Sequence, residues 1–117
     1  MSRSHTASVG RLINAAPVFA ALGDETRLNM VARLCANGPL SIVRLTKGTK
    51  VSRQAITKHL RALAQAGLVR SKRQGRERIW EIETKRLAET RRYLDQISDQ
   101  WDQAIGRLRA LVEKGGQ

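Results

Sequence analysis

The chain has 117 residues, the size of one ordinary domain, and 41% of them are hydrophobic and 27% charged, which is enough apolar material for a core. It has no apolar run near the roughly 18 residues of a membrane span, no secretory signal in its first ten residues, and one cysteine, which excludes an internal disulfide, so we expect a cytoplasmic, nucleoid-associated protein. The 22 Lys and Arg against 10 Asp and Glu give +12, which predicts a polyanionic partner such as nucleic acid or a membrane surface.

The N-terminal segment is the least informative part of the chain. Residues 1–16 look like a tail, in which Leu12 can belong to a short helix that contributes to self-association. Pro17 suits the first position of a helix, where its missing N–H costs nothing, and a short helix is therefore expected over 17–22.

The next predicted helix is bounded by clear signals. Asp24 is a good N-cap, and Gly38 followed by Pro39 ends the helix after Asn37. Apolar residues at three- and four-residue intervals form the stripe expected to face the core: Leu28, Val31, Leu34 and Cys35. On that stripe Cys35 is expected to act as a small hydrophobe rather than as a redox sensor.

Two further helices form a helix-turn-helix pattern. A short helix is expected over 42–47, and a second one over 53–66 after a turn and the N-cap Ser52. The apolar residues of the second helix recur at helical spacing on one side. A stripe of hydrogen-bonding groups occupies the opposite side: Gln54, Thr57, Lys58 and Arg61. His59 lies next to this stripe, where packing or a phosphate contact is the expected role.

After Gly67 the period changes from that of a helix to that of strands. Residues 68–73 and 77–82 are rich in β-branched and aromatic residues with partial alternation, and 74–76 (QGR) predict the turn between them. Trp80 lies on the second strand, where packing is expected. A basic-tipped hairpin directly after a recognition helix is typical of a wing.

The last predicted element is one long helix over 84–114. Its apolar residues alternate at three- and four-residue steps, with Leu87 and Thr90 extending the register backwards. The seam consists of Leu94, Ile97, Trp101, Ala104, Leu108 and Leu111. A homodimer is the economical explanation for such a seam; the alternatives are a helix that lies across its own domain and a seam that binds a different protein.

The positive charge is concentrated in the middle of the chain. Eleven Lys and Arg residues lie between Leu40 and Trp80 against one acid, Glu77, so this segment carries ten of the twelve net positive charges. Because soluble proteins usually intersperse both signs, we expect this segment to form the binding surface.

Three runs of residues resemble the ArsR/SmtB family of bacterial winged helix-turn-helix repressors. Residues 19–28 (FAALGDETRL) are similar to its opening signature, and 52–60 (SRQAITKHL) with 66–69 (AGLV) to its recognition-helix signature. Residues 73–76 (RQGR) leading to Trp80 resemble its wing, although a tyrosine is more usual in the family at the position of Trp80. The resemblance implies a mainly α fold with a small β-hairpin, with a winged helix-turn-helix domain over 17–83 and a C-terminal dimerisation helix over 84–117.

The resemblance also implies a function. A homodimer joined by its terminal helices would bind an inverted repeat in promoter DNA and block polymerase. Arg53 and Gln54 would read base edges, while Ser52, Thr57 and Lys58 would hold phosphates and the wing would meet the backbone or the minor groove. The full set expected at the DNA is Arg44, Lys47, Lys50, Ser52, Arg53, Gln54, Thr57, Lys58, Arg61, Arg73, Arg76 and Arg78.

The chain departs from the metal-sensing relatives. Their Leu-Cys-x-Cys stretch corresponds here to 40–43 (LSIV), so both thiolates are missing. Asp95, Asp99 and Asp102 share a helix face, but without imidazole or thiolate we expect them to be solvated and paired with Arg91 and Arg92. We therefore expect no metal and no cofactor, and the sequence names no effector.

The sequence gives less support to other classes of function. An enzyme is disfavoured because the sequence contains no phosphate loop and no nucleophile–base motif. The remaining alternative is a non-specific architectural or RNA-binding basic protein, which would discriminate little between sequences.

Overall fold

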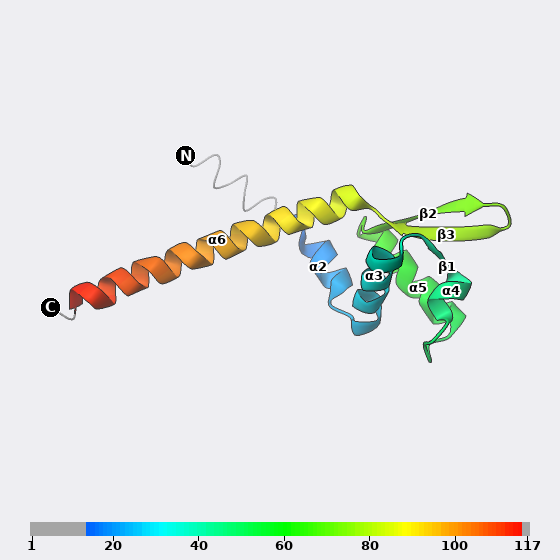
Figure 1. Cartoon of the computed structure of the whole chain (residues 1–117), viewed down its shortest axis with the longest axis horizontal. Coiled ribbons are helices and arrows are strands. Elements are labelled where there is room, and N and C mark those ends of the chain that lie inside the picture. The colour runs from blue at the N-terminus through cyan, green and yellow to red at the C-terminus, as the bar shows by residue number, and fades with distance from the viewer. Residues whose placement is uncertain (1–13, 116–117) are drawn as a thin grey trace.

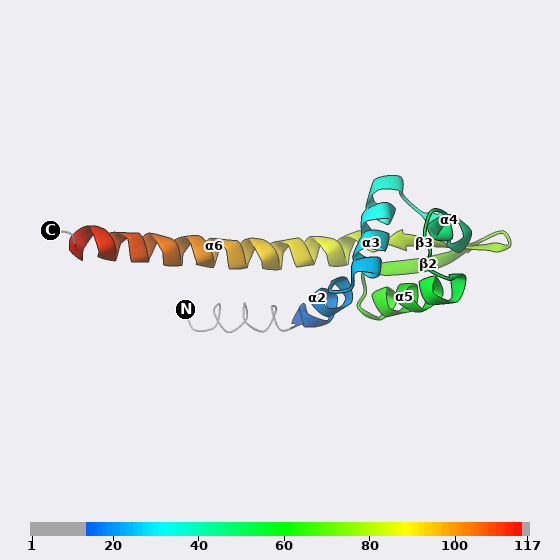
Figure 2. The ribbon, with the colours of Figure 1, turned by 90° about the horizontal axis from the view of Figure 1, so that it is seen from below.

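The computed structural model describes residues 14–115 of the chain. A domain of short helices and a small sheet lies at one end, and a single long helix runs away from it (Figures 1 and 2). The elements in chain order are α2 (Ala16–Leu22), α3 (Glu25–Asn37), β1 (Leu40–Ser41), α4 (Ile42–Thr46), α5 (Arg53–Gln65), β2 (Val69–Gln74), β3 (Glu77–Ile82) and α6 (Thr84–Gly115). The expected helices and the hairpin are confirmed. The expected contribution of Leu12 lies outside the described residues.

The helix boundaries follow the expected capping chemistry. The Asp24 side chain accepts a hydrogen bond from the backbone N–H of Arg27 at 2.9 Å, and the Ser52 hydroxyl accepts one from Ala55 at 3.2 Å. Gly38, with φ of +77°, donates its N–H to the Leu34 carbonyl at the end of α3. These local signals account for the accuracy of the predicted helix starts.

The sheet has three antiparallel strands in the order β1-β3-β2, so β3 is central. The short strand β1 was not expected from the sequence; it pairs Leu40 with Trp80. The β2–β3 hairpin turns at Gly75–Arg76, with Gly75 at φ +65°, which suits a tight two-residue turn. Trp80 is buried in the core, as expected for a packing residue.

The core gathers the inner faces of α2, α3, α4, α5 and the sheet into one apolar cluster. Its fully buried side chains include Val18, Met30, Leu45, Ile56, Leu60, Leu63 and Leu68. The predicted stripe of α3 was partly wrong. Leu28 and Cys35 are exposed, and Met30 is buried with Val31 and Leu34, so the inner face of α3 is rotated from the one read off the sequence.

Two arginines connect elements that are distant in sequence. Arg33 of α3 donates to the carbonyls of Leu45 at 2.7 Å and Arg44 at 3.0 Å, and so holds the C-terminal end of α4. Arg86 of α6 donates to the carbonyls of Ala66 at 3.3 Å and Asn14 at 3.1 Å, which fixes the start of α6 against the end of α5. Both contacts satisfy backbone groups at helix ends.

Helix α6 packs on the domain only through its first turns. Leu87 packs against the core and Thr90 is 3% exposed, so these two residues belong to the domain rather than to an open seam. Beyond its first turns α6 projects away from the domain (Figure 1), and the molecule measures 70 × 32 × 20 Å. The helix therefore does not lie across its own domain. Within residues 14–115, none of the helices is both long and apolar enough to cross a membrane.

Candidate nucleic-acid interface

Helix α5 has one buried face and one polar face. Ile56, Leu60 and Leu63 are fully buried, and this fixes the opposite side of the helix outward. On that side Gln54, Lys58 and Arg61 are exposed and Thr57 is half-buried, its hydroxyl donating to the Arg53 carbonyl at 3.0 Å. The structure thus places the predicted polar stripe on the surface.

Helix α4, which precedes α5, is held in a fixed position and carries exposed cations. Arg44, Lys47 and Lys50 are exposed on α4 and on the turn between α4 and α5. Ser41 caps α4 by accepting from the backbone N–H of Arg44 at 3.3 Å, and Arg33 holds the other end. The short helix is therefore anchored at both ends beside α5.

The wing carries a pair of facing arginines. Arg73 and Arg78 are directly opposite in the β2–β3 register, both exposed, and Arg78 donates to the Ser71 hydroxyl at 2.8 Å. Like charges at opposed positions in a sheet are destabilising, so this pair costs stability in the free protein. An anion at the wing would remove that cost.

The recognition helix and the wing meet at a hollow of about 280 Å³. Its lining comes from the start of α4, the start of α5 and the turn of the hairpin: Ser41, Ile42, Val43, Arg53, Arg76, Glu77 and Arg78. Three arginines from two elements distant in sequence thus converge on one concave surface, with a single carboxylate among them. This convergence could not be read from sequence spacing.

Part of the positive charge is neutralised. Arg70 lies 2.9 Å from a carboxylate oxygen of Glu81 and 3.3 Å from one of Glu83, and Lys72 lies 3.6 Å from Glu81. The expectation that Glu77 is the one acid near these cations was wrong, because Glu81 and Glu83 reach back across the hairpin. Arg70 and Lys72 alternate with Arg73 along β2, so they point to the other face of the sheet.

His59 is placed on the flank of α5 that faces α3. Its Nδ1 atom lies 3.5 Å from Nη1 of Arg27 and 3.9 Å from a carboxylate oxygen of Asp24. The hydrogen bond from the Arg27 backbone holds the pKa of Asp24 below its usual 3.8, and the charges of Arg27 and His59 add to this effect. The polar contacts of His59 are therefore made within its own domain, to two residues at the start of α3.

The seam of α6 is open to solvent. Leu94, Trp101, Leu108 and Leu111 are each more than half exposed and Ile97 is 44% exposed, while Ala104 is half-buried. At the base of this seam Leu22 of α2 joins α6 residues around a mainly apolar hollow of about 410 Å³: Thr84, Leu87, Ala88, Thr90, Arg91 and Leu94.

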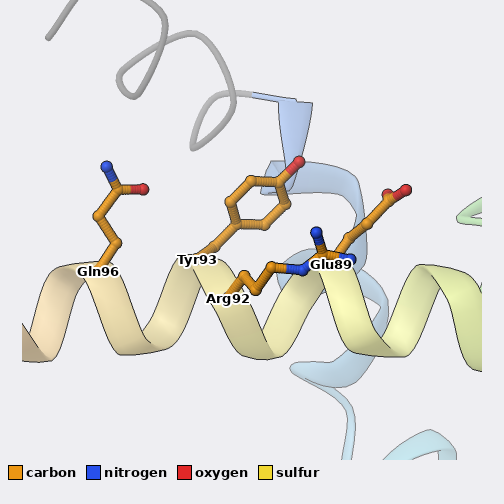
Figure 3. A pocket seen from close by; sticks show the side chains of 4 residues that line it. All are labelled: Glu89, Arg92, Tyr93 and Gln96. Carbon is orange, nitrogen blue, oxygen red and sulfur yellow. The ribbon is translucent and has the colours of Figure 1, made fainter. Parts of the chain in front are cut away.

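A second, polar hollow on α6 was missed by sequence reasoning. It is lined by Glu89, Arg92, Tyr93 and Gln96, and Tyr93 and Gln96 project from the same side of the helix (Figure 3). Glu89 accepts from Arg86 at 3.3 Å, which ties this surface to the start of α6.

The three aspartates of α6 are exposed, and none of the ion pairs formed within residues 14–115 includes them. The expected pairing with Arg91 and Arg92 is therefore absent from this part of the chain, because the side chains extend into water. No group of three or more His, Cys, Asp or Glu residues in the described part is placed to hold a metal ion.

A helix-turn-helix with an outward polar recognition helix, followed by an arginine-tipped hairpin, defines a winged helix-turn-helix DNA-binding protein. The sequence profile of a helix-turn-helix domain matches residues 22–72. The HTH-type transcriptional regulator Rv2034 of Mycobacterium tuberculosis is 35% identical over 96 residues, covering 82% of this chain and 86% of that protein. The chain therefore belongs to the helix-turn-helix transcriptional regulators.

Two further relatives carry the name ArsR. The structure of an ArsR-like transcriptional regulator from Rhodococcus sp. RHA1 is similar with a TM-score of 0.74 and 38% identity, covering 87% of this chain and 95% of that one. The arsenic resistance transcriptional regulator ArsR1 of Pseudomonas putida is 34% identical over 58 residues, half of this chain and 45% of its own length. These relatives are regulators of transcription. The chain belongs to the ArsR family of helix-turn-helix transcriptional regulators and is a DNA-binding regulator of transcription.

Proposed function

We propose that the protein is a repressor that binds an inverted-repeat operator as a homodimer. The observation that carries the proposal is the hollow in which Arg53 of α5 meets Arg76 and Arg78 of the wing. A recognition helix in the major groove places its N-terminal residues at base edges, and the wing beside it then meets the adjacent backbone. The concave surface between them suits the phosphate ridge that separates the two contacts.

The roles within this surface follow from side-chain chemistry. Arg53 and Gln54 lie exposed in the first turn of α5 and have the donor patterns that pair with guanine and adenine. Ser52, Thr57 and Lys58 are assigned to phosphates. The flanking cations are assigned to the backbone on either side: Arg44, Lys47, Lys50 and Arg61 from the helices, and Arg73, Arg76 and Arg78 from the wing.

The dimer is proposed from the projecting half of α6. Six apolar positions at heptad spacing remain exposed to partly exposed in the single chain, and the apolar hollow beside Leu22 continues the same surface. Apolar seams at this spacing are usually covered by a second helix. A twofold axis through α6 would present two copies of α5 to successive half-sites, so the operator would be an inverted repeat. Occupying such a site within a promoter would exclude polymerase.

The test is base discrimination. A duplex selected from a random pool by the protein is compared with scrambled duplexes for the wild type, Arg53→Ala and Gln54→Ala. Each substitution is expected to cost about 1–3 kcal/mol on the selected duplex and much less on scrambled ones, because a base contact is lost. Arg70→Ala is the matched control, since it removes an equal charge that Glu81 and Glu83 already neutralise.

Two results would contradict the proposal. An equal loss on all duplexes would restrict Arg53 and Gln54 to phosphate contacts. A pool that yields no preferred duplex would favour the non-specific architectural or RNA-binding alternative, because a specific regulator prefers its site by about a thousandfold or more.

A further inference from the structure

One polar contact connects the recognition helix to the rest of the domain on the side away from DNA. The Arg27 side chain donates from Nε to the Ala21 carbonyl at the end of α2 at 2.6 Å, and its Nη1 lies 3.5 Å from Nδ1 of His59 on α5. Arg27 itself lies on α3. A single guanidinium therefore touches three helices.

The hydrogen bonds of Arg27 are directional, whereas the apolar contacts that surround them are not. Around Arg27 the groove between α2 and α5 is lined largely by alanines and by Pro17, and the buried face of α5 consists of Ile56, Leu60 and Leu63. Apolar contacts of this kind fix which side of α5 faces outward, but they permit small rotations about the helix axis because they have no preferred angle. A hydrogen bond between fixed groups supplies such an angle.

The charge state of His59 decides whether the contact can form. Arg27 has only donors, so it can hydrogen-bond to Nδ1 only when that nitrogen is unprotonated. The charged groups that face His59 are Arg27 and Asp24, both from the start of α3, and α2 carries no charged side chain. Asp24 remains a carboxylate across the range in which histidines titrate, because its pKa is lowered from 3.8.

We propose that His59 is a positioning residue for DNA reading: by accepting a hydrogen bond from Arg27, it sets the rotation of α5 that aims Arg53 and Gln54 at the bases. The inference rests on the proposed reading role of α5. Protonation of His59 removes the acceptor and places two cations side by side, with Asp24 compensating only in part. Lowering the pH then makes the orientation of Arg53 and Gln54 less well defined. At the same time it adds a positive charge, which favours binding to any DNA.

The proposal therefore predicts that the affinity for scrambled duplexes and the preference for the selected duplex respond differently to pH. Between about pH 8 and about pH 5.5, where histidine changes charge, affinity for scrambled duplexes is expected to stay level or rise. The preference for the selected duplex over scrambled ones is expected to fall by about threefold to tenfold, the worth of one hydrogen bond. A residue with a purely structural role would change the binding of selected and scrambled duplexes together.

The variants are chosen around the acceptor. His59→Gln keeps a side-chain acceptor that does not titrate, so its preference is expected to be independent of pH. His59→Leu has no acceptor and is expected to show the low preference at both pH values. His5→Gln alters the other histidine of the chain and is expected to behave as the wild type. Circular dichroism at both pH values confirms that each protein compared is folded.

The outcomes separate the two proposals. If Arg53→Ala loses preference but the wild type keeps the same preference at both pH values, α5 reads DNA and the positioning role of His59 is refuted. A pH effect that persists in His59→Gln, or disappears in His5→Gln, also refutes it. If Arg53→Ala leaves the preference intact, the reading role of α5 fails, and the positioning role fails with it.

Discussion

Single arginines serve two purposes in this protein, and their partners separate them. Arg27, Arg33 and Arg86 donate to backbone carbonyls and join helices, whereas Arg53 and Arg76 line an exposed hollow with few acids. Composition counts all of these cations alike. The sequence could therefore predict which segment is basic, but not that Arg70 and Lys72 are neutralised by Glu81, because that pairing crosses a hairpin.

Cys35 illustrates the same limit within a helix. Its spacing from Leu28 and Leu34 is compatible with an apolar stripe, yet Met30 and Val31 are buried and Cys35 is exposed. Several apolar residues on α3 allow two stripes about one residue apart, and only the packing against α5 and the sheet chooses between them. Helical periodicity alone does not fix the rotation of a helix with many apolar positions.

At Asp24 the structure predicts a pH dependence of stability. The folded-state pKa of Asp24 is lowered from 3.8, so its stabilising effect is fully present above that value and is lost as the pH falls through the folded pKa. Asp24→Asn keeps an N-cap acceptor that does not ionise, and it is expected to flatten the fall in stability below about pH 4. Urea unfolding between about pH 3 and about pH 6 measures this. A variant whose pH profile follows the wild type would show that the fall comes from other carboxyls.

At the scale of elements, local signals explain what was predicted. The N-caps Asp24 and Ser52, the break at Gly38–Pro39 and the turn at Gly75 lie next to the boundaries they set, and those boundaries are confirmed. Strand β1 was missed because two residues carry no periodicity, and its pairing with Trp80 joins positions 40 residues apart. The hollow between α5 and the wing depends on this same pairing, which is why no motif predicted it.

The wing gives a prediction for the salt dependence of binding. Arg76 occupies the hairpin turn and lines the hollow, so removing it is expected to lose one phosphate contact. Arg76→Ala should weaken binding to all duplexes and reduce the slope of log affinity against log salt by about one. Lys72→Ala on the same hairpin is the control, because Glu81 already pairs with that lysine. An unchanged slope in Arg76→Ala would place the wing outside the interface.

At the scale of the whole molecule, the single chain is more extended than a compact domain of the same length. Its radius of gyration is 19.4 Å, against about 13 Å for a compact chain of this length. The excess comes from α6, whose 32 residues span about 48 Å. The heptad pattern predicted the seam, and the structure adds that its outer part is exposed and packs against no other element within residues 14–115. An uncovered apolar stripe of this length is unusual in a monomer.

Trp101 is the sharpest probe of what covers that stripe. Its side chain is 67% exposed in the single chain, so Trp101→Asp removes no contact within the domain and the monomer should stay folded. In the proposed dimer the same change buries an unpaired charge, which is strongly unfavourable. We expect light scattering to show a dimer for the wild type and a monomer for the variant, with DNA binding weakened because half-sites are then bound singly.

The control for this substitution is Gln103→Asp, which adds the same charge to an exposed position two residues along α6, on the opposite side of the helix. It should leave the dimer intact. Tryptophan fluorescence gives a second reading, because covering Trp101 shifts its emission to the blue while Trp80 is already buried and stays unchanged. If Trp101→Asp remains a dimer, or both variants dissociate equally, the seam is not the contact between protomers and the twofold arrangement of recognition helices needs another origin.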